Sequence, residues 1–292
     1  MTSVDKSGLS SAVTTYTFDV AYPVETGLWL FDDGLTDLSA SDTSSASRKH
    51  PLTLSGGTGQ VAGPHQLFGA RAVDAPDLAM TLDGATASAS TTVAVVDTTK
   101  SYTVAAIVRL SAGATAYGKA YTAVAQDGKV SSGFALGYRP AGEAGCTVPR
   151  GCWAMSVPSA DGSATVARSI APLAATEERW TLLVGERNAT AGTVRMWACD
   201  IGNPDDPTRG EPLAGNSASL TQKWAANGSF TVGRAKVQGV GAELWPGVID
   251  DVRVFSGQVV AESKIRRLCQ GAEAGDFPGG VVALDPTEPI DD

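Results

Sequence analysis

The sequence predicts an all-β protein, a two-sheet antiparallel β-sandwich with one short C-terminal helix. Three observations support this prediction. Apolar residues alternate with a period of two in about ten short segments, turn-forming pairs separate these segments, and only one stretch has helical spacing. A parallel α/β fold is excluded, because no amphipathic helix alternates with the strand-like segments.

The clearest strand is 101–110, in which Tyr102, Val104, Ala106 and Val108 share one face. A period of two places alternate side chains on the same side of a strand, whereas a helix needs a period near 3.6. Turn pairs of the Asp-Gly and Asn-Gly type end several of the segments. Further strands are predicted at 27–31, 79–82, 121–126, 132–139, 152–157, 179–187, 193–200, 229–234 and 247–255.

The helix is predicted at 260–268, where Ile265 and Leu268 are three residues apart and Gly271 follows as a stop signal. Basic residues near its C-terminal end suit the helix dipole. A length of 292 residues suggests two domains at roughly 150 residues each, but the strand pattern supports a single sandwich over 23–272.

Both ends of the chain differ in composition from the sandwich. Residues 1–22 are interpreted as a linker or the end of an upstream module, with one strand-like piece at 16–21. Residues 273–292 are interpreted as a Pro/Asp-rich linker or tail. No export signal is present in this stretch of sequence, so we expect a fragment of a longer protein whose other domains are its neighbours.

Composition excludes some classes of partner. The formal charge of −9 and the isoelectric point near 4.8, with no Lys/Arg cluster, argue against binding to nucleic acid or to anionic membrane surfaces. No apolar run approaches the ~18 residues that a membrane-spanning helix needs, so no membrane insertion is expected.

Four cysteines favour an oxidising compartment. Cys146 and Cys152 bracket a short loop and can reach disulfide distance, which leaves Cys199 and Cys269 as the second pair. Sequence alone allows three pairings, and four buried free thiols are the alternative.

Several segments resemble, in order, the landmarks of laminin-G-like jelly-roll modules. The most specific is 247–255, GVIDDVRVF, which is similar to the closing strand of that family almost residue for residue. The other landmarks are GLWLFDDG at 27–34, LDG at 82–84, SYTV at 101–104, WTLLV at 180–184 and FTVGR at 230–234.

These landmarks cover roughly 23–270, and the chain looks like the concanavalin A-like lectin/glucanase superfamily, laminin-G-like branch, as found in large secreted actinobacterial proteins. The resemblance implies two curved sheets, often a structural calcium, and recognition of glycans or proteins. The sequence departs from the family pattern around Trp197, Cys199 and Asp200 and in the 143–152 hairpin. Binding residues carried over from relatives are therefore in question near those loops.

The usual catalytic motifs are not found in the sequence, although isolated acids could still meet in space. Retaining glucanases of the same superfamily need Glu-x-Asp-x-x-Glu on one strand, and no Glu here is followed by Asp at the second position. His50 and His65, the two histidines, both stand beside Pro and lack a Gly-x-Ser-x-Gly partner motif. The sequence predicts a protein that is not an enzyme.

Calcium is the one cofactor that the sequence suggests. Asp32 or Asp33 of the first strand would approach Asp250 of the last, since these strands are neighbours in the resembled fold, and Ca²⁺ binds carboxylate oxygens. Strict alternation would put Asp250 and Asp251 on opposite faces, so only one would serve a given site. The alternative is that these acids cap turns.

A sugar site needs an aromatic platform and polar side chains that donate to hydroxyls. Trp245, between Leu244 and Pro246, is the tryptophan expected to be exposed, whereas Trp29 and Trp180 are assigned to the core. The predicted ligand-binding residues are Tyr117, Tyr121, Arg139, Trp197 and Trp245, and Tyr138 and Trp153 are further candidates.

The sequence therefore predicts a non-enzymatic, carbohydrate-binding or adhesion module of a secreted or cell-surface bacterial protein, with a glycan or polysaccharide partner. A structural or protein-interaction jelly roll, including the phage tail-fibre type, is the alternative, and a glycan-active enzyme is the third hypothesis.

Overall fold

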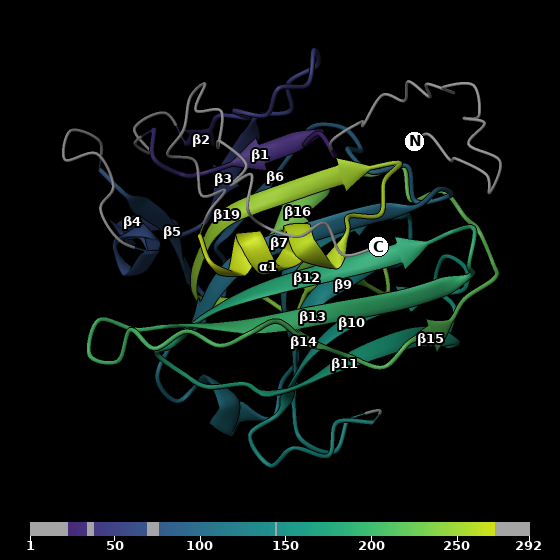
Figure 1. Ribbon diagram of the computed structural model, residues 1–292. Helices are drawn as coiled ribbons and strands as arrows, with labels where there is room; N and C mark the ends of the chain where they lie inside the picture. Colours follow the sequence, from purple (N-terminus) through teal and green to yellow (C-terminus); the bar gives the residue numbers. More distant parts are fainter. Residues whose placement is uncertain (1–22, 34–37, 69–75, 144, 272–292) are drawn as a thin grey trace, which may run out of the picture.

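The computed structural model describes residues 23–33, 38–68, 76–143 and 145–271 (Figure 1). Two large antiparallel sheets carry most of this part of the chain, and one short α-helix lies outside them. The predicted all-β, two-sheet class with a C-terminal helix is confirmed. The predictions for 1–22, its strand-like piece at 16–21 and the 273–292 tail lie outside the described residues.

The first sheet has nine strands in the order β14-β13-β12-β7-β19-β5-β4, with β1 paired to β19 and β15 paired to β13. The central pair, β7 and β19, places the strand that resembles the family's closing strand in the middle of the sheet. The bounds are β1 Gly27–Trp29, β4 Gly59–Ala62, β5 Leu78–Asp83, β7 Tyr102–Leu110, β12 Trp180–Asn188, β13 Thr193–Gly202, β14 Leu213–Ala214, β15 Ala218–Ser219 and β19 Pro246–Ser256.

The second sheet has eight strands in the order β11-β10-β9-β8-β16-β6-β3-β2. A separate hairpin, β17–β18, follows β16 and lies over β8 and β9. The bounds are β2 Ser39–Ala40, β3 Leu52–Ser55, β6 Ser88–Ser90, β8 Tyr121–Asp127, β9 Ser132–Arg139, β10 Cys152–Pro158, β11 Val166–Ala174, β16 Phe230–Val232, β17 Ala235–Val237 and β18 Val240–Ala242.

The main core fills the space between the two sheets. The alternation predicted for 101–110 is observed, since Val104, Ala106 and Val108 point into this core. Aromatic rings cross from sheet to sheet, and Trp29 stacks on Phe230 with ring centroids 5.2 Å apart.

A second apolar cluster lies on the outer face of the nine-stranded sheet. It includes Ala105 and Ile107, the residues of β7 that alternate with the core positions. Helix α1 (Glu262–Cys269) buries Ile265 and Leu268 against this face, as the three-residue spacing predicted (Figure 1). The short 3₁₀ helix η1 (His65–Phe68) packs beside it, whereas the 3₁₀ helix η2 (Ala114–Tyr117) follows β7.

The outer face of the eight-stranded sheet is different. Among the described residues it has no helix over it, and the β17–β18 hairpin is its cover. Ala125, Ala135 and Ala235 form the small cluster beneath the hairpin. Elsewhere this face carries both polar residues, such as Ser156 and Arg168, and apolar ones, such as Pro158 and Val166. In the described ranges, no helix is long and apolar enough to cross a membrane.

Candidate ligand-binding site

A groove of about 140 Å³ opens on the outer face of the eight-stranded sheet, beside the β17–β18 hairpin. We call it the arginine groove. Polar and charged side chains of strands β9, β10 and β11 and of the hairpin line it. The residues that define it are Arg139, Glu143, Ser156, Arg168, Lys236 and Glu243.

Strand alternation places these side chains on the same face. In β9, Phe134, Leu136 and Tyr138 point into the core, so Arg139 points outward. In the neighbouring pair, Ser156 of β10 is directly opposite Arg168 of β11. Cross-strand partners share a face, and the Arg168 Nε–H donates to the Ser156 hydroxyl at 2.9 Å.

Arg139 is the most deeply placed cation of the groove. The residue is 3% exposed, and its Nη1 lies 2.8 Å from Glu243 Oε1. The other oxygen of Glu243 accepts a 2.5 Å hydrogen bond from the Thr122 hydroxyl. Arg139 Nε is buried and has no hydrogen-bond partner among the described residues. A buried donor of this kind is costly to leave unsatisfied.

Arg168 lies within electrostatic range of Arg139. Burial lowers the pKa of Arg168, the positive charge of Arg139 lowers it further, and the carboxylates of Glu143 and Glu243 oppose both effects. Glu143 Oε1 is 3.7 Å from Arg168 Nη2, which is longer than a hydrogen bond. Two guanidinium groups are thus held near one another on a chain whose net charge is −9.

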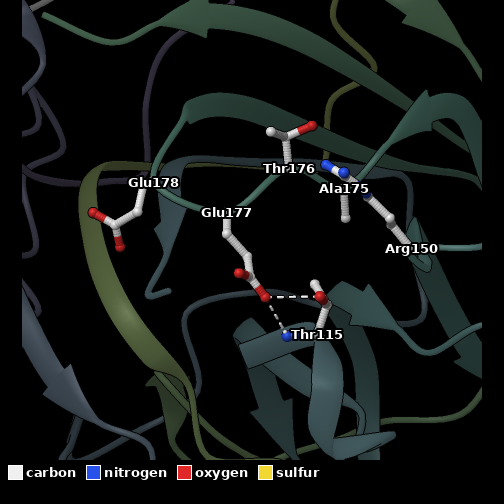
Figure 2. Close-up of a pocket in the computed structure, with 6 residues that line it drawn as sticks. All are labelled: Thr115, Arg150, Ala175, Thr176, Glu177 and Glu178. Atoms are coloured by element: carbon white, nitrogen blue, oxygen red, sulfur yellow. Dashed lines mark hydrogen bonds between the residues drawn. The ribbon is translucent and has the colours of Figure 1, made fainter. Parts of the chain in front are cut away.

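A second pocket, of about 480 Å³, lies near the end of β7 and contains two consecutive glutamates (Figure 2). Glu177 is directed at η2, where its carboxylate accepts from the Thr115 amide and hydroxyl at 2.6 and 2.7 Å and from the Gly113 amide at 2.7 Å. Glu178 accepts from the Ala112 amide at 2.8 Å. Arg150 lines the opposite side.

These bonds hold the Glu177 carboxylate in its ionised form. Burial acts to raise the pKa of Glu177, but the hydrogen bonds from Thr115 and Gly113 and the charge of Arg150 lower it overall. A general acid needs a raised pKa, so this carboxylate is suited to holding η2 in place rather than to proton transfer.

The predicted aromatic binding residues are mostly buried. Trp245 is 0% exposed and stacks on Trp153 with centroids 6.3 Å apart, so the expectation that Trp245 is exposed is wrong. Tyr121 is buried against Tyr138, a further candidate that is itself in the core. Core packing of these rings leaves no face for a sugar.

Of the other two predicted aromatic residues, one is buried and one is exposed. Trp197 is buried on the outer face of the nine-stranded sheet, where the Arg195 guanidinium lies 4.9 Å from its ring centroid. Tyr117 is 70% exposed at the end of η2. Arg139 alone of the predicted ligand-binding residues lines the arginine groove.

In the part of the chain that the structure describes, Asp32, Asp33 and Asp250 do not form one cluster of metal-ligating groups. Asp32 Oδ1 accepts from the Leu78 amide at 2.8 Å, and Asp33 Oδ2 accepts from the Ser41 amide at 2.7 Å. Both carboxylates therefore hold backbone, as the alternative interpretation anticipated. Among the described residues, Asp250 instead gathers with His65 and Asp77, with one ligating atom of each within 4.8 Å of the others.

A β-bulge explains why Asp250 and Asp251 are not on opposite faces. Between Asp250 and Arg253 the register of β19 on β7 shifts, and Asp251 has a φ of 47°. Both acids act on His65: burial favours the neutral imidazole, but the hydrogen bond to Asp77 and the charges of Asp250 and Asp251 raise its pKa to about 9. The imidazolium supplies positive charge to this buried acidic cluster.

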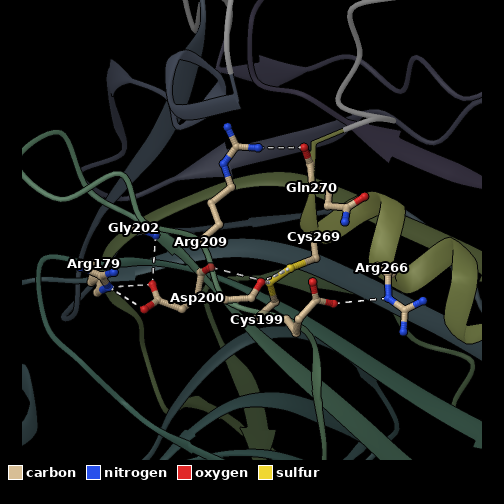
Figure 3. Close-up of a disulfide and its surroundings, with 10 residues drawn as sticks. Arg179, Cys199, Asp200, Gly202, Arg209, Arg266, Cys269 and Gln270 are labelled. Carbon is tan, nitrogen blue, oxygen red and sulfur yellow. Dashed lines mark hydrogen bonds and ion pairs between the residues drawn. A yellow bond between two sulfur atoms is a disulfide. The ribbon is translucent and has the colours of Figure 1, made fainter.

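Both predicted disulfides form. Cys146 pairs with Cys152 across the loop that follows β9, with a Cα–Cα distance of 5.7 Å. Cys199 of β13 pairs with Cys269 at the end of α1 (Figure 3). Beside this second bridge, Arg209 of the loop after β13 donates to the Gln270 carbonyl at 3.0 Å. The second disulfide therefore links helix α1 covalently to the nine-stranded sheet over the apolar cluster on its outer face.

Sequence reasoning missed most of the groove. Arg168 lies in a strand that was not predicted, Lys236 lies in a hairpin that was not predicted, and Glu243 directly follows that hairpin. One signal in the sequence could have indicated this face: Arg168 and Ile170 alternate along a strand that pairs with the strand of Ser156. The small outward-facing residues Ala135 and Ala154 are a second signal.

Comparison with known proteins supports the fold. No protein-family model matches the chain, and no curated protein sequence matches it. Among solved structures, it is similar to the binding domain of botulinum neurotoxin serotype D (TM-score 0.53, 10% identity, 85% of this chain and 52% of that chain). It is also similar to the serotype G binding domain (0.52, 8%, 84% and 50%).

A third similar structure is the Trypanosoma rangeli sialidase in complex with 2,3-difluorosialic acid (TM-score 0.51, 13% identity, 92% of this chain and 35% of that chain). The chain spans about half the length of the two toxin binding domains. At these identities the likeness shows a shared lectin-like jelly-roll sandwich and nothing about ligands.

Proposed function

We propose that this domain is a non-enzymatic carbohydrate-binding module that recognises glycans through the arginine groove. The observation that carries the proposal is the groove itself: a concave site on the open face of the sandwich, lined by several hydrogen-bonding side chains held by ion pairs. Fixed polar groups that converge on a hollow are the general requirement for orienting a polyhydroxylated ligand.

The groove is chemically complementary to a sugar, although its described lining residues include no aromatic platform. Serine and arginine donors and glutamate acceptors match hydroxyl groups, and Pro158, Val166 and Val237 provide apolar contact at the rim. The two similar botulinum neurotoxin structures are binding domains, which is compatible with this role but does not transfer a ligand.

The wider assignment is part of the same proposal. The landmark segments favour the laminin-G-like branch and a bacterial, actinobacterial-type source protein. Two disulfides suit a secreted or cell-surface location. A structural calcium belongs to the same proposal, and an unchanged melting temperature after chelation would remove it.

A glycan array tests the function. The purified chain should bind a subset of plant, cell-wall or host glycans, and Ser156→Tyr, which fills the groove floor, should abolish that binding. Ser219→Tyr, on the exposed edge strand β15 of the other sheet, is the matched control and should bind like the native chain. Absence of binding to every glycan, or equal binding by the Ser156→Tyr variant, would contradict the proposal.

A further inference from the structure

The charges around the arginine groove are not balanced. Arg139 and Arg168 contact Glu243 and Glu143, while the adjoining Arg234 and Lys236 share the single carboxylate of Asp127, at 3.0 and 3.4 Å. Among the described residues that line the groove, Arg139, Arg168 and Lys236 outnumber the carboxylates of Glu143 and Glu243 by one. The whole chain has a formal net charge of −9, so this patch is positive on a protein that is negative overall.

We propose that the arginine groove recognises the carboxylate of an acidic sugar, a uronic acid or a sialic acid, through Arg139 and Arg168. The inference rests on the proposed glycan-binding function and narrows its ligand class. Guanidinium groups present planar, paired N–H donors that match a carboxylate, and they are the side chains best suited to charged, directional recognition.

Arg139 and Arg168 lie in an electrostatically unfavourable arrangement. Two guanidinium groups repel, and the positive charge of Arg139 acts to lower the pKa of Arg168. Arg139 also holds its Nε–H buried and without a partner among the described residues. A ligand anion in the groove beside the two groups would offset their repulsion, which favours binding of an anion over a neutral hydroxyl.

Size and charge limit the anion. Pockets for drug-sized ligands measure about 300–1,000 Å³, so a groove of about 140 Å³ takes one sugar residue or its charged edge, not a stretch of polymer. An excess of one cation over the carboxylates among the described lining residues suits a singly charged carboxylate. A phosphate monoester, with about two negative charges at neutral pH, would bring excess charge close to Glu143 and Glu243.

Titration calorimetry with defined sugars tests the inference on the full chain. The probes are glucuronic acid and N-acetylneuraminic acid, each paired with its methyl ester, and glucose as the neutral reference. Binding of one acid should exceed binding of its ester at least about tenfold, since a hydrogen bond to a charged group contributes roughly ten- to a hundredfold. Which acid binds distinguishes the two sources of the carboxylate.

Variants assign the effect to the two arginines. Arg168→Gln should lower the affinity for the acid about tenfold or more and leave little preference over the ester, and Arg139→Lys should do the same while keeping a cation beside Glu243. Arg195→Gln, on the other outer face, is the matched control and should not change binding.

Failure of the inference differs from failure of the function. Equal affinity for acid and ester, with loss of both in Ser156→Tyr, would overturn carboxylate recognition while keeping a glycan-binding groove. An acid preference that survives Arg168→Gln and Arg139→Lys would also overturn the role of the arginines. No binding of any sugar, charged or neutral, here or on the array, would remove the proposed function itself.

Discussion

The two outer faces of the sandwich have opposite characters. The outer face of the nine-stranded sheet is apolar, and helix α1 and the Cys199–Cys269 bridge close it. The outer face of the eight-stranded sheet mixes charged and apolar side chains around the arginine groove, and the β17–β18 hairpin covers part of it. One sheet therefore builds a second core that adds stability, whereas the other leaves a charged surface available to a ligand.

Cations play different parts on the two faces. On the covered face they lie over aromatic rings, with Arg109 5.0 Å from the ring centroid of Trp180 and Lys264 5.4 Å from that of Phe255. On the open face Arg139 and Arg168 contact carboxylates and line a hollow. Arginine thus packs over an aromatic ring on one face and lines a groove on the other.

The largest expected difference between the faces concerns their disulfides. Replacing Cys199 and Cys269 with alanine should lower the free energy of unfolding by about 4 kcal/mol, since the bridge closes a loop with a sequence separation of 70. Chemical denaturation of the oxidised chain, compared with the double variant, measures this loss.

The matched control is the bridge beside the open face. Cys146 and Cys152 are separated by 6 positions, so their replacement should cost only about 2 kcal/mol and should leave α1 in place. If both double variants lost the same stability, the covered face would not depend on its covalent closure.

A smaller effect concerns a buried acid on the covered face. Burial raises the pKa of Glu186 to about 7, although the nearby charge of Arg195 acts to lower it. The folded state binds this proton more tightly than the unfolded chain, so the stability contributed by Glu186 falls as pH rises from about 4.5 through 7.

Glu186→Gln should therefore stabilise the protein by on the order of 2 kcal/mol at pH 8 and change little at pH 4.5. Thermal unfolding at the two pH values checks this. The variant should still lose stability between pH 6.5 and 9, because the raised pKa of His65 makes its contribution complete below 6.5 and lost as pH passes about 9. A variant that is destabilised at pH 8 would show that Glu186 is needed in its charged form.

The fold could be predicted because it depends on local periodicity. Strand β7 alternates cleanly, and α1 carries its two apolar residues on one side, so each element indicates its own buried face. The disulfides could be predicted because one loop is short enough to close by itself, which leaves a single partner for each remaining cysteine.

The site could not be predicted in the same way, because it depends on which chain segments meet. Strand β11 ends the eight-stranded sheet and contains Pro172, a residue that edge strands tolerate but that obscures a strand in the sequence. Trp245 stands in a short stretch between β18 and β19, and nothing local shows that this stretch turns its ring onto Trp153. The bulge at Asp251 likewise breaks an alternation that the sequence displays without interruption.

The smallest expected effect on stability comes from two valines that differ only in the face they occupy. Val237 lines the arginine groove and Val259 precedes α1, and both are 39% exposed. Val237→Ser and Val259→Ser should each change the free energy of unfolding by no more than about 0.5 kcal/mol, since neither side chain is buried enough to leave a cavity.

The effects of the two substitutions on glycan binding should differ. Val237→Ser removes apolar contact at the groove rim and should weaken glycan binding roughly threefold. Val259→Ser should leave it unchanged, so equal affinity of the two variants would place the ligand away from the hairpin.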